Sequence, residues 1–123
     1  MTTTDEAHHR AGDGDVKIIR DGLTDRIPAQ ALRIEKDAGI VLSMLQEKST
    51  EEVREFAGSG WSDPNELADA LEVLHGLAHH AGIDWETVET ARIHKRRERG
   101  GFEDGLVYDR RLDPTIMQDE DGR

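Results

Sequence analysis

The chain has 123 residues, of which 35% are hydrophobic and 35% are charged, and its formal net charge is -11. This length predicts one domain with a lean core, and we expect oligomerisation to complete that core. The negative charge argues against general binding of nucleic-acid polymers, which requires a basic face, and it suits a protein that collects cations. The absence of cysteine excludes disulfides and thiolate metal sites.

The sequence also lacks the marks of a membrane or secreted protein. No apolar run approaches the roughly 20 residues that cross a bilayer. The N-terminal stretch MTTTDEAHHRAGDGD is polar and has no segment resembling a signal peptide. We therefore expect a disordered tail over residues 1–15, no membrane partner and a cytoplasmic location.

Short extended pieces are expected between this tail and the first helix. The apolar segment 16–19 favours a short strand, and the segment 32–34 favours a second extended piece. Ile27 precedes a proline and is therefore biased away from helix.

A first helix is predicted over residues 35–56. Gly39 is a weak point near its start, and the sequence AGSGW ends the pattern with two glycines. The apolar residues that recur close to the helical period are Ala38, Val41, Leu42, Leu45, Val53 and Phe56.

A second helix is predicted to begin near Pro64 and to end at Gly82. Ser62 or Asp63 can cap it, and Glu66 lies in its first turn. One apolar stripe is made by Leu67, Leu71, Leu74, Ala78 and Ala81, and it is widened by Ala70, Val73 and Leu77. The short connection to the first helix predicts that the two pack antiparallel.

A third helix is expected between Asp84, which can cap it, and Gly100, which stops it. The sequence HKRRER near its end suits the helix dipole. The segment FEDGLVY favours a terminal strand, and residues 109–123 read as an acidic tail. The predicted fold is therefore all-α: an antiparallel helical bundle of about three helices with short terminal extended segments.

Two acidic pairs stand at the shared end of the first two helices. Glu52 and Glu55 are three residues apart, as are Glu66 and Asp69, so each pair occupies one helix face. In an antiparallel hairpin all four carboxylates can converge. Such oxygen ligands suit Mg²⁺ or Mn²⁺ rather than zinc, and a carboxylate-bound Mg²⁺ typically handles phosphates. The alternative is that the pairs are solvated faces, because a chain with 27 acidic residues contains such pairs by chance.

Three motifs in order strengthen the metal interpretation. EEVREF, ELADALEVL and RERGGF resemble motifs of the all-α nucleoside triphosphate pyrophosphohydrolases, the MazG-like superfamily. The resemblance is closest to a small branch of phosphoribosyl-ATP pyrophosphohydrolase-like proteins, and it covers roughly residues 17–108. It implies a MazG-like domain over residues 16–108 that forms a homodimer or homotetramer.

The resemblance also implies an activity and the residues that carry it. Members of this family bind Mg²⁺ through acids that correspond to Glu52, Glu55, Glu66 and Asp69. They hydrolyse a nucleotide between its α and β phosphates, giving a monophosphate and pyrophosphate. Glu51 matches the first acid of the E-E-x-x-E motif, and either Glu51 or Glu55 is expected to act as the base.

Basic residues near both ends of the domain are candidates for binding phosphate. Lys95, Arg96 and Arg99 lie in the HKRRERGGF segment, although a basic helix end that satisfies the dipole is the alternative. The family opening resembles LVRDKIP, whereas this chain reads KIIRDGLTDRIP, so Lys17, Arg20 and Arg26 all remain candidates.

Two other interpretations stay open from the sequence. The chain could be a non-catalytic helical module that binds a nucleotide or a protein, and the split opening motif mildly favours this. His75 and His79, four residues apart, could bind a transition metal, but no third ligand at suitable spacing accompanies them.

Overall fold

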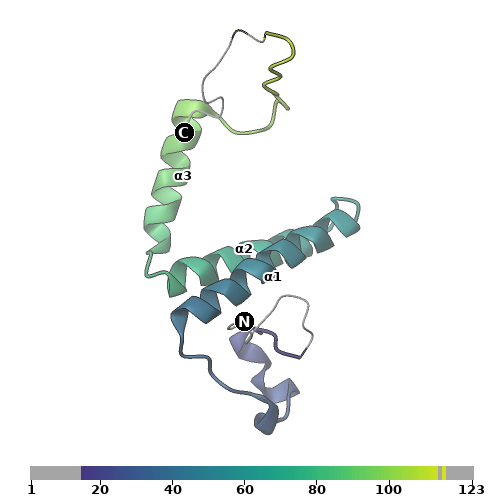
Figure 1. Ribbon diagram of the computed structural model, residues 1–123, viewed down its shortest axis with the longest axis vertical. Helices are drawn as coiled ribbons and strands as arrows, with labels where there is room; N and C mark the ends of the chain where they lie inside the picture. The colour runs from purple at the N-terminus through teal and green to yellow at the C-terminus, as the bar shows by residue number, and fades with distance from the viewer. Residues whose placement is uncertain (1–14, 114, 116–123) are drawn as a thin grey trace. The chain divides into compact units, whose positions relative to one another are not determined.

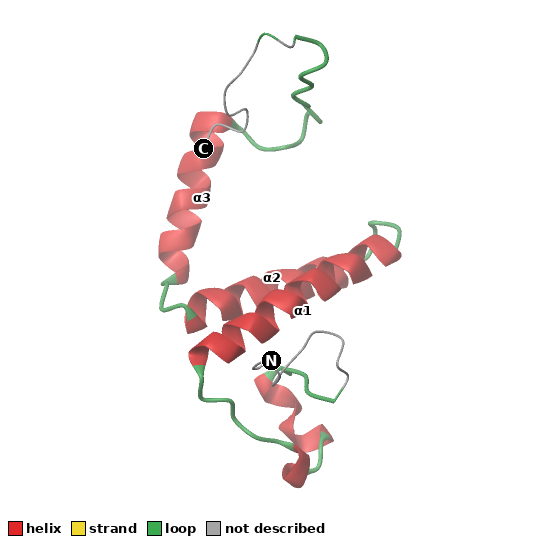
Figure 2. Ribbon diagram, in the orientation of Figure 1, coloured by secondary structure: helices red, strands yellow, loops and turns green. Residues whose placement is uncertain are grey.

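The regular structure of the chain is helical, as predicted. The computed structural model describes residues 15–113 and 115. Its elements are the 3₁₀-helices η1 (Asp21–Arg26) and η2 (Ala29–Ala31) and the α-helices α1 (Ala38–Gly58), α2 (Pro64–His80) and α3 (Trp85–Arg99). Figure 1 shows them in chain order, and Figure 2 shows them by type.

The strand predictions were wrong. Within the described residues there is no strand, and both 16–19 and 102–108 lack regular structure. A single strand without a partner leaves its backbone groups unpaired, so neither segment gains from being one. Between residues 16–19 and α1 the chain instead forms the short 3₁₀-helices η1 and η2, which the sequence analysis did not predict. Apart from Asp15, the expected N-terminal tail lies outside the described residues, as does most of 109–123.

Helix α1 begins three residues later than expected because of its cap. The side chain of Asp37 accepts hydrogen bonds from the backbone N–H groups of Gly39, at 2.9 Å, and Ile40, at 3.2 Å. An aspartate at this position satisfies donors that the first helical turn leaves free. At the other end α1 continues to Gly58, two residues beyond the predicted end.

Helix α2 has the predicted start. Asp63 is its cap and accepts a hydrogen bond from Asn65 N at 2.9 Å, with Pro64 at the first position. The loop between α1 and α2 is tied by Ser59, whose Oγ accepts from the backbone N–H groups of Ser62 and Asp63. This short closed loop fixes the end of α1 against the start of α2.

Helices α1 and α2 pack antiparallel, as predicted. Leu45 in the middle of α1 lies beside Gly76 in the second half of α2, whereas Glu52 near the end of α1 lies beside Glu66 at the start of α2. The core cluster consists of Val41, Leu45 and Val73, with Ile18 and Leu77 packed against it. The residues before η1 therefore help to cover the hairpin.

The core uses only part of the apolar stripe predicted on α2: Ala78 of the stripe and two of the residues that widen it are buried, whereas its leucines are not. Ala70 and Val73 are buried, at 7% and 6% exposure. Leu67, Leu71 and Leu74, which the pattern placed in the stripe, are 53%, 50% and 46% exposed. The two faces are neighbours on the helix, and α1 covers only one of them.

Residues 86–113 belong to a second compact unit of the chain. Helix α3 has no buried residue, and Gly100, with φ of 80°, ends it in the left-handed conformation that glycine adopts readily. Arg96 and Glu103 form an ion pair at 3.0 Å across Gly101, where a Cβ would collide with both side chains. Both side chains meet Gly101 with their flexible ends, which can move aside, so only Gly100 is required as glycine by its backbone conformation.

Across the described residues, no helix combines the length and the apolar character needed to cross a bilayer.

Candidate metal centre

Three of the four predicted metal ligands come together at the closed end of the α1–α2 hairpin. One carboxylate oxygen from each of Glu52, Glu55 and Glu66 lies within 4.8 Å of the other two. Ligand oxygens around Mg²⁺ lie roughly 3–4 Å apart, so small side-chain rotations would close these three around one ion. Two successive turns of α1 and the first turn of α2 supply them, which the antiparallel packing requires.

Glu52 is the most unusual of the three because it is buried. The residue is 7% exposed. Among the residues that the structure describes, no other charged side chain is buried. Its Oε1 has no hydrogen-bond partner among the described residues, and its Oε2 lies 3.6 Å from Lys48 Nζ. An unsatisfied buried polar atom is costly, by about 1–3 kcal/mol. A cation at the cluster would satisfy this oxygen, and oxygen ligands fit a hard divalent ion.

The pKa values of the cluster's carboxyls also reflect burial and mutual repulsion. Burial raises the pKa of the Glu52 carboxyl, and repulsion from Glu55 adds to the effect, while Lys48 opposes it. The pKa of Glu66 is raised as well, first by desolvation and then by repulsion from Glu55. Both carboxyls therefore bind protons more tightly than free ones, which is the expected behaviour of acids gathered without a cation.

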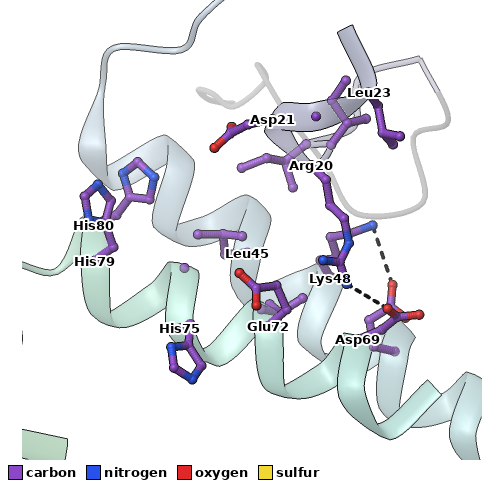
Figure 3. A pocket seen from close by; sticks show the side chains of 16 residues that line it. Arg20, Asp21, Leu23, Leu45, Lys48, Asp69, Glu72, His75, His79 and His80 are labelled. Atoms are coloured by element: carbon purple, nitrogen blue, oxygen red, sulfur yellow. Dashed lines mark hydrogen bonds and ion pairs between the residues drawn. The ribbon is translucent and has the colours of Figure 1, made fainter. Parts of the chain in front are cut away.

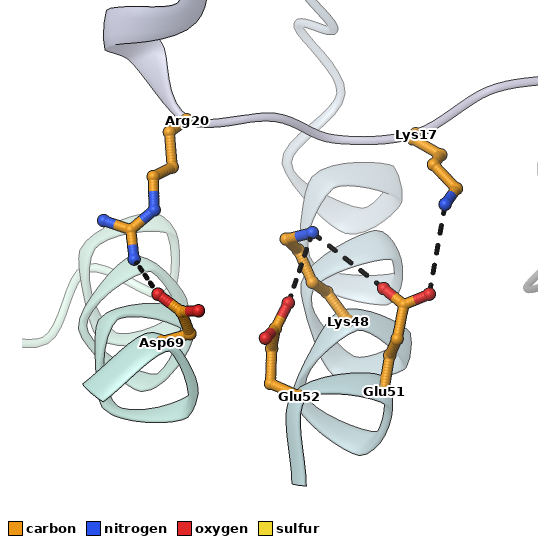
Figure 4. A network of polar contacts seen from close by, with 6 residues as sticks. All are labelled: Lys17, Arg20, Lys48, Glu51, Glu52 and Asp69. Atoms are coloured by element: carbon orange, nitrogen blue, oxygen red, sulfur yellow. Dashed lines mark hydrogen bonds and ion pairs between the residues drawn. The ribbon is translucent and has the colours of Figure 1, made fainter. Parts of the chain in front are cut away.

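Basic side chains border the cluster on the side of the N-terminal segment. Lys48 Nζ lies 3.9 Å from Glu51 and 3.6 Å from Glu52, and Lys17 Nζ lies 4.0 Å from the other oxygen of Glu51 (Figure 4). Lys48 is only 28% exposed. The sequence reasoning did not include Lys48 in the site, although its spacing of three and four residues from Glu51 and Glu52 is the signal for such pairs.

Asp69 does not belong to the group of three converging carboxylates. Its Oδ1 accepts a hydrogen bond of 2.7 Å from Arg20 Nη2, at the start of η1 (Figure 4). Asp69 is nevertheless close enough to raise the pKa of Glu52 and of Glu66 by repulsion. Its role as a fourth ligand stays a prediction, since the ion pair with Arg20 holds it in this structure.

A cleft lies beside the cluster. Its volume is about 890 Å³, and it is lined by residues 18–23 together with residues of α1 and α2 (Figure 3). Glu52, Lys48, Arg20 and Asp69 line one part of it. The remaining lining combines apolar side chains such as Leu45 and Val73 with Glu72 and three histidines of α2. The cleft therefore joins charged groups suited to phosphate and metal to a more apolar wall.

The basic candidates are placed very differently. Arg20 reaches the acidic end of the hairpin, whereas Arg26 is exposed at the far end of η1 and does not line the cleft. Lys95, Arg96 and Arg99 are all exposed on α3, in the separate second unit, where Arg96 pairs with Glu103. Their contact with a substrate stays a prediction.

The histidine pair gives no support to a transition-metal site. His75 stacks on Trp85, with ring centroids 3.6 Å apart and planes 24° from parallel. Among the described residues, no group of three or more metal-ligating side chains includes a histidine. Among the described residues, the carboxylate cluster is the group that could hold a cation.

Comparisons of this chain with protein-family models, with curated proteins and with solved structures found no match. The resemblance to the MazG-like superfamily therefore rests on the motifs alone.

The Arg20–Asp69 ion pair leads to a testable expectation. Because both side chains are about half exposed, Arg20→Gln should change the free energy of unfolding by no more than about 1 kcal/mol. The same variant frees Asp69 and removes a positive charge beside the cluster, so it should bind Mg²⁺ severalfold more tightly in calorimetric titrations. Arg26→Gln is the matched control and should leave Mg²⁺ binding unchanged. Weaker binding by Arg20→Gln would mean that Arg20 orders the site instead of competing for it.

Proposed function

We propose that this protein is a Mg²⁺-dependent hydrolase that cleaves a nucleotide between its α and β phosphates, with addition of water, to give a monophosphate and pyrophosphate. The observation that carries the proposal is the convergence of Glu52, Glu55 and Glu66, with a buried oxygen of Glu52 left without a partner. This cluster is the evidence for a divalent cation as the cofactor. The choice of nucleotides as substrates comes from the order of the EEVREF, ELADALEVL and RERGGF motifs.

The carboxylates have separable roles in this proposal. Glu52, Glu55 and Glu66 hold the cation, and Asp69 completes the set when it leaves Arg20. Bound Mg²⁺ neutralises charge on phosphate oxygens and orients them. Glu51 is the better candidate for the base because it lies next to the cluster but outside it, whereas Glu55 is engaged within it. Glu51 lies between Lys17 and Lys48, with one lysine near each of its carboxylate oxygens.

Basic side chains along the cleft supply charge for the phosphates. Lys17, Arg20 and Lys48 now pair with carboxylates at distances of 4.0, 2.7 and 3.6–3.9 Å. When a cation neutralises Glu52 and Asp69, Lys48 and Arg20 become available to phosphate oxygens, to which they bind with charge-assisted hydrogen bonds, whereas Lys17 stays beside Glu51. Phosphate binding by Lys95, Arg96 and Arg99 stays a prediction from the RERGGF motif.

The proposal is tested by incubating the protein with a panel of nucleoside triphosphates and related nucleotides, with Mg²⁺ and with excess chelator. We expect pyrophosphate and a nucleoside monophosphate as the products, in equal amounts and only with the metal. Separating the products by chromatography distinguishes this cut from release of inorganic phosphate. Binding of Mg²⁺ and nucleotide without any turnover would favour the non-catalytic binding module instead.

A further inference from the structure

The cleft beside the carboxylate cluster runs along α2 and has two ends of different chemistry. One row of its lining residues follows this helix: Asp69, Val73, Gly76 and His80. They are four, three and four positions apart, so at 100° per residue they share one face of α2, over a length of about 16 Å. Asp69 lies at the charged end, beside Glu52 and Lys48. His79 and His80 form the opposite end, which we call the far end of the cleft.

The row on α2 carries no side chain in its middle, because position 76 is a glycine in the interior of the helix. Glycine weakens a helix relative to alanine, so its presence there calls for a reason. A Cβ at Gly76 would lie 3.5 Å from both Cδ atoms of Leu45, which is an ordinary contact, and Gly76 does not have a positive φ. Neither packing nor backbone conformation therefore requires this glycine. Its effect is an open floor between Val73 and His80, with Leu45 beside it.

The far end of the cleft is aromatic. The rings of His79 and His80 are in contact, with centroids 4.9 Å apart and planes 86° from parallel. The apolar side chains of Leu45 and Val73 line the cleft between this end and the charged one. Flat heteroaromatic rings such as nucleobases stack on aromatic side chains and pack against apolar ones. The middle and the far end of the cleft thus suit a nucleobase, as the charged end suits phosphates.

An acceptor without a partner lines the same cleft. Asp21, at the start of η1, points its carboxylate from this 3₁₀-helix into the cleft (Figure 3). Among the described residues, no hydrogen bond or ion pair holds this carboxylate, whereas the neighbouring Arg20 is bound to Asp69. An ionised carboxylate accepts hydrogen bonds and donates none. A ligand group beside Asp21 is therefore favoured when it carries N–H donors and disfavoured when it presents an oxygen acceptor.

We propose that the cleft binds the nucleoside part of the substrate, with the base over Gly76, and that Asp21 selects bases that carry an amino group. This inference rests on the proposed function, in which the phosphates lie at the charged end. Adenine, guanine and cytosine each offer an amino group to a carboxylate, whereas uracil and thymine carry carbonyl oxygens instead. The cleft volume of about 890 Å³ lies within the roughly 300–1,000 Å³ of small-molecule sites, and its length suits an extended nucleotide.

The first test compares nucleotides that differ at one exocyclic group, which is an amino group or a carbonyl oxygen. The α,β-methylene analogues of CTP, UTP, ATP and ITP cannot be cut between the α and β phosphates, so calorimetric titration with Mg²⁺ measures their binding without turnover. We expect the CTP analogue to bind about tenfold more tightly than the UTP analogue, and the ATP analogue to exceed the ITP analogue similarly, since a hydrogen bond to a charged group contributes at least this much.

Asp21→Asn should remove this preference, because an amide can donate to a carbonyl oxygen as readily as it can accept from an amino group. Asp25→Asn is the matched control, since Asp25 is exposed on the same 3₁₀-helix but does not line the cleft, and it should keep the preference. If the unaltered protein does not distinguish the members of each pair, or if Asp21→Asn retains the full preference, Asp21 does not read the base and the proposal is overturned.

The second test fills the floor of the cleft. Gly76→Ala adds a methyl group that has room beside Leu45, so it should bind the analogues nearly as well and raise the melting temperature. Gly76→Met places a side chain where the base is proposed to lie, so it should lose binding of all four analogues while its helical circular dichroism is retained. Ala68→Met adds the same side chain at an exposed position of α2 outside the cleft and should bind normally. A folded Gly76→Met protein that binds the analogues as the unaltered protein does overturns this placement of the base.

These outcomes are separate from the test of the proposed function. Pyrophosphate release by a protein whose binding ignores the base and tolerates Gly76→Met would leave the hydrolase standing and overturn the base site. Base-selective binding of the analogues, without pyrophosphate release from the corresponding triphosphates, would leave the base site standing and overturn the hydrolase. Absence of binding for every analogue overturns the base site, whether or not turnover is seen.

Discussion

Replacing Glu52 with Gln is expected to reduce Mg²⁺-dependent pyrophosphate release by about a hundredfold or more, since even residues that only orient metal ligands typically matter by 10–100-fold. Gln keeps the shape of the side chain but removes the charge that the cation needs. The same substitution should remove most of the rise in melting temperature that Mg²⁺ produces in the unaltered protein. That rise follows from binding to the folded state alone, and it grows with concentration.

The control for this prediction is Glu72→Gln. Glu72 is an exposed acid of α2 that lines the cleft but lies outside the group of three converging carboxylates. Its replacement removes the same charge from the same hairpin and should affect both measurements much less. Asp69→Asn is the informative intermediate case: a loss comparable to that of Glu52→Gln would place Asp69 among the ligands, against its present pairing with Arg20. If Glu52→Gln retains full turnover and the full Mg²⁺ shift, the cluster holds no functional cation.

The helices and their order could be predicted from the sequence because they depend on local signals. Pro64 after a capping Asp63, and Gly100 after a basic run, act within a few residues, and the structure confirms both ends. The acidic pairs could be placed at one end of the hairpin for the same reason, since a short loop leaves little choice of packing. The convergence of Glu52, Glu55 and Glu66 follows from these two facts together.

The features that could not be predicted from the sequence depend on contacts between distant segments. Asp69 has the same helical spacing from Glu66 as Glu55 has from Glu52, but Arg20, 49 residues away, binds it. The apolar stripe of α2 spans more than one face, and periodicity alone does not say which face meets α1. The choice of Ala70 and Val73 over Leu67 and Leu71 appears only when the two helices are packed. The prediction of a strand at 16–19 was wrong because apolar residues there can cover a helical hairpin as well as join a sheet.

The stability of the metal-free protein should depend on pH through Glu52. Burial raises the pKa of this carboxyl in the folded protein above its ordinary value of 4.5. Below pH 4.5 both the folded and the unfolded chain hold the proton, so the group imposes no cost. As the pH rises from there through the raised pKa, the unfolded chain releases its proton first, and the folded state loses stability relative to it.

Comparing variants isolates this effect from the other acids of the chain. Some of these, such as Glu35 and Asp109, have a lowered pKa and contribute in the opposite sense. Without metal, Glu52→Gln should therefore match the unaltered protein near pH 4 and become more stable than it, by about 1–3 kcal/mol, near pH 7.5, as measured by urea denaturation. With saturating Mg²⁺ the order should reverse at pH 7.5, because the cation competes with the proton for Glu52 and stabilises only the protein that retains its charge. If the difference between the two proteins does not change with pH or with Mg²⁺, Glu52 is an ordinary buried side chain and the carboxylate cluster is not a cation site.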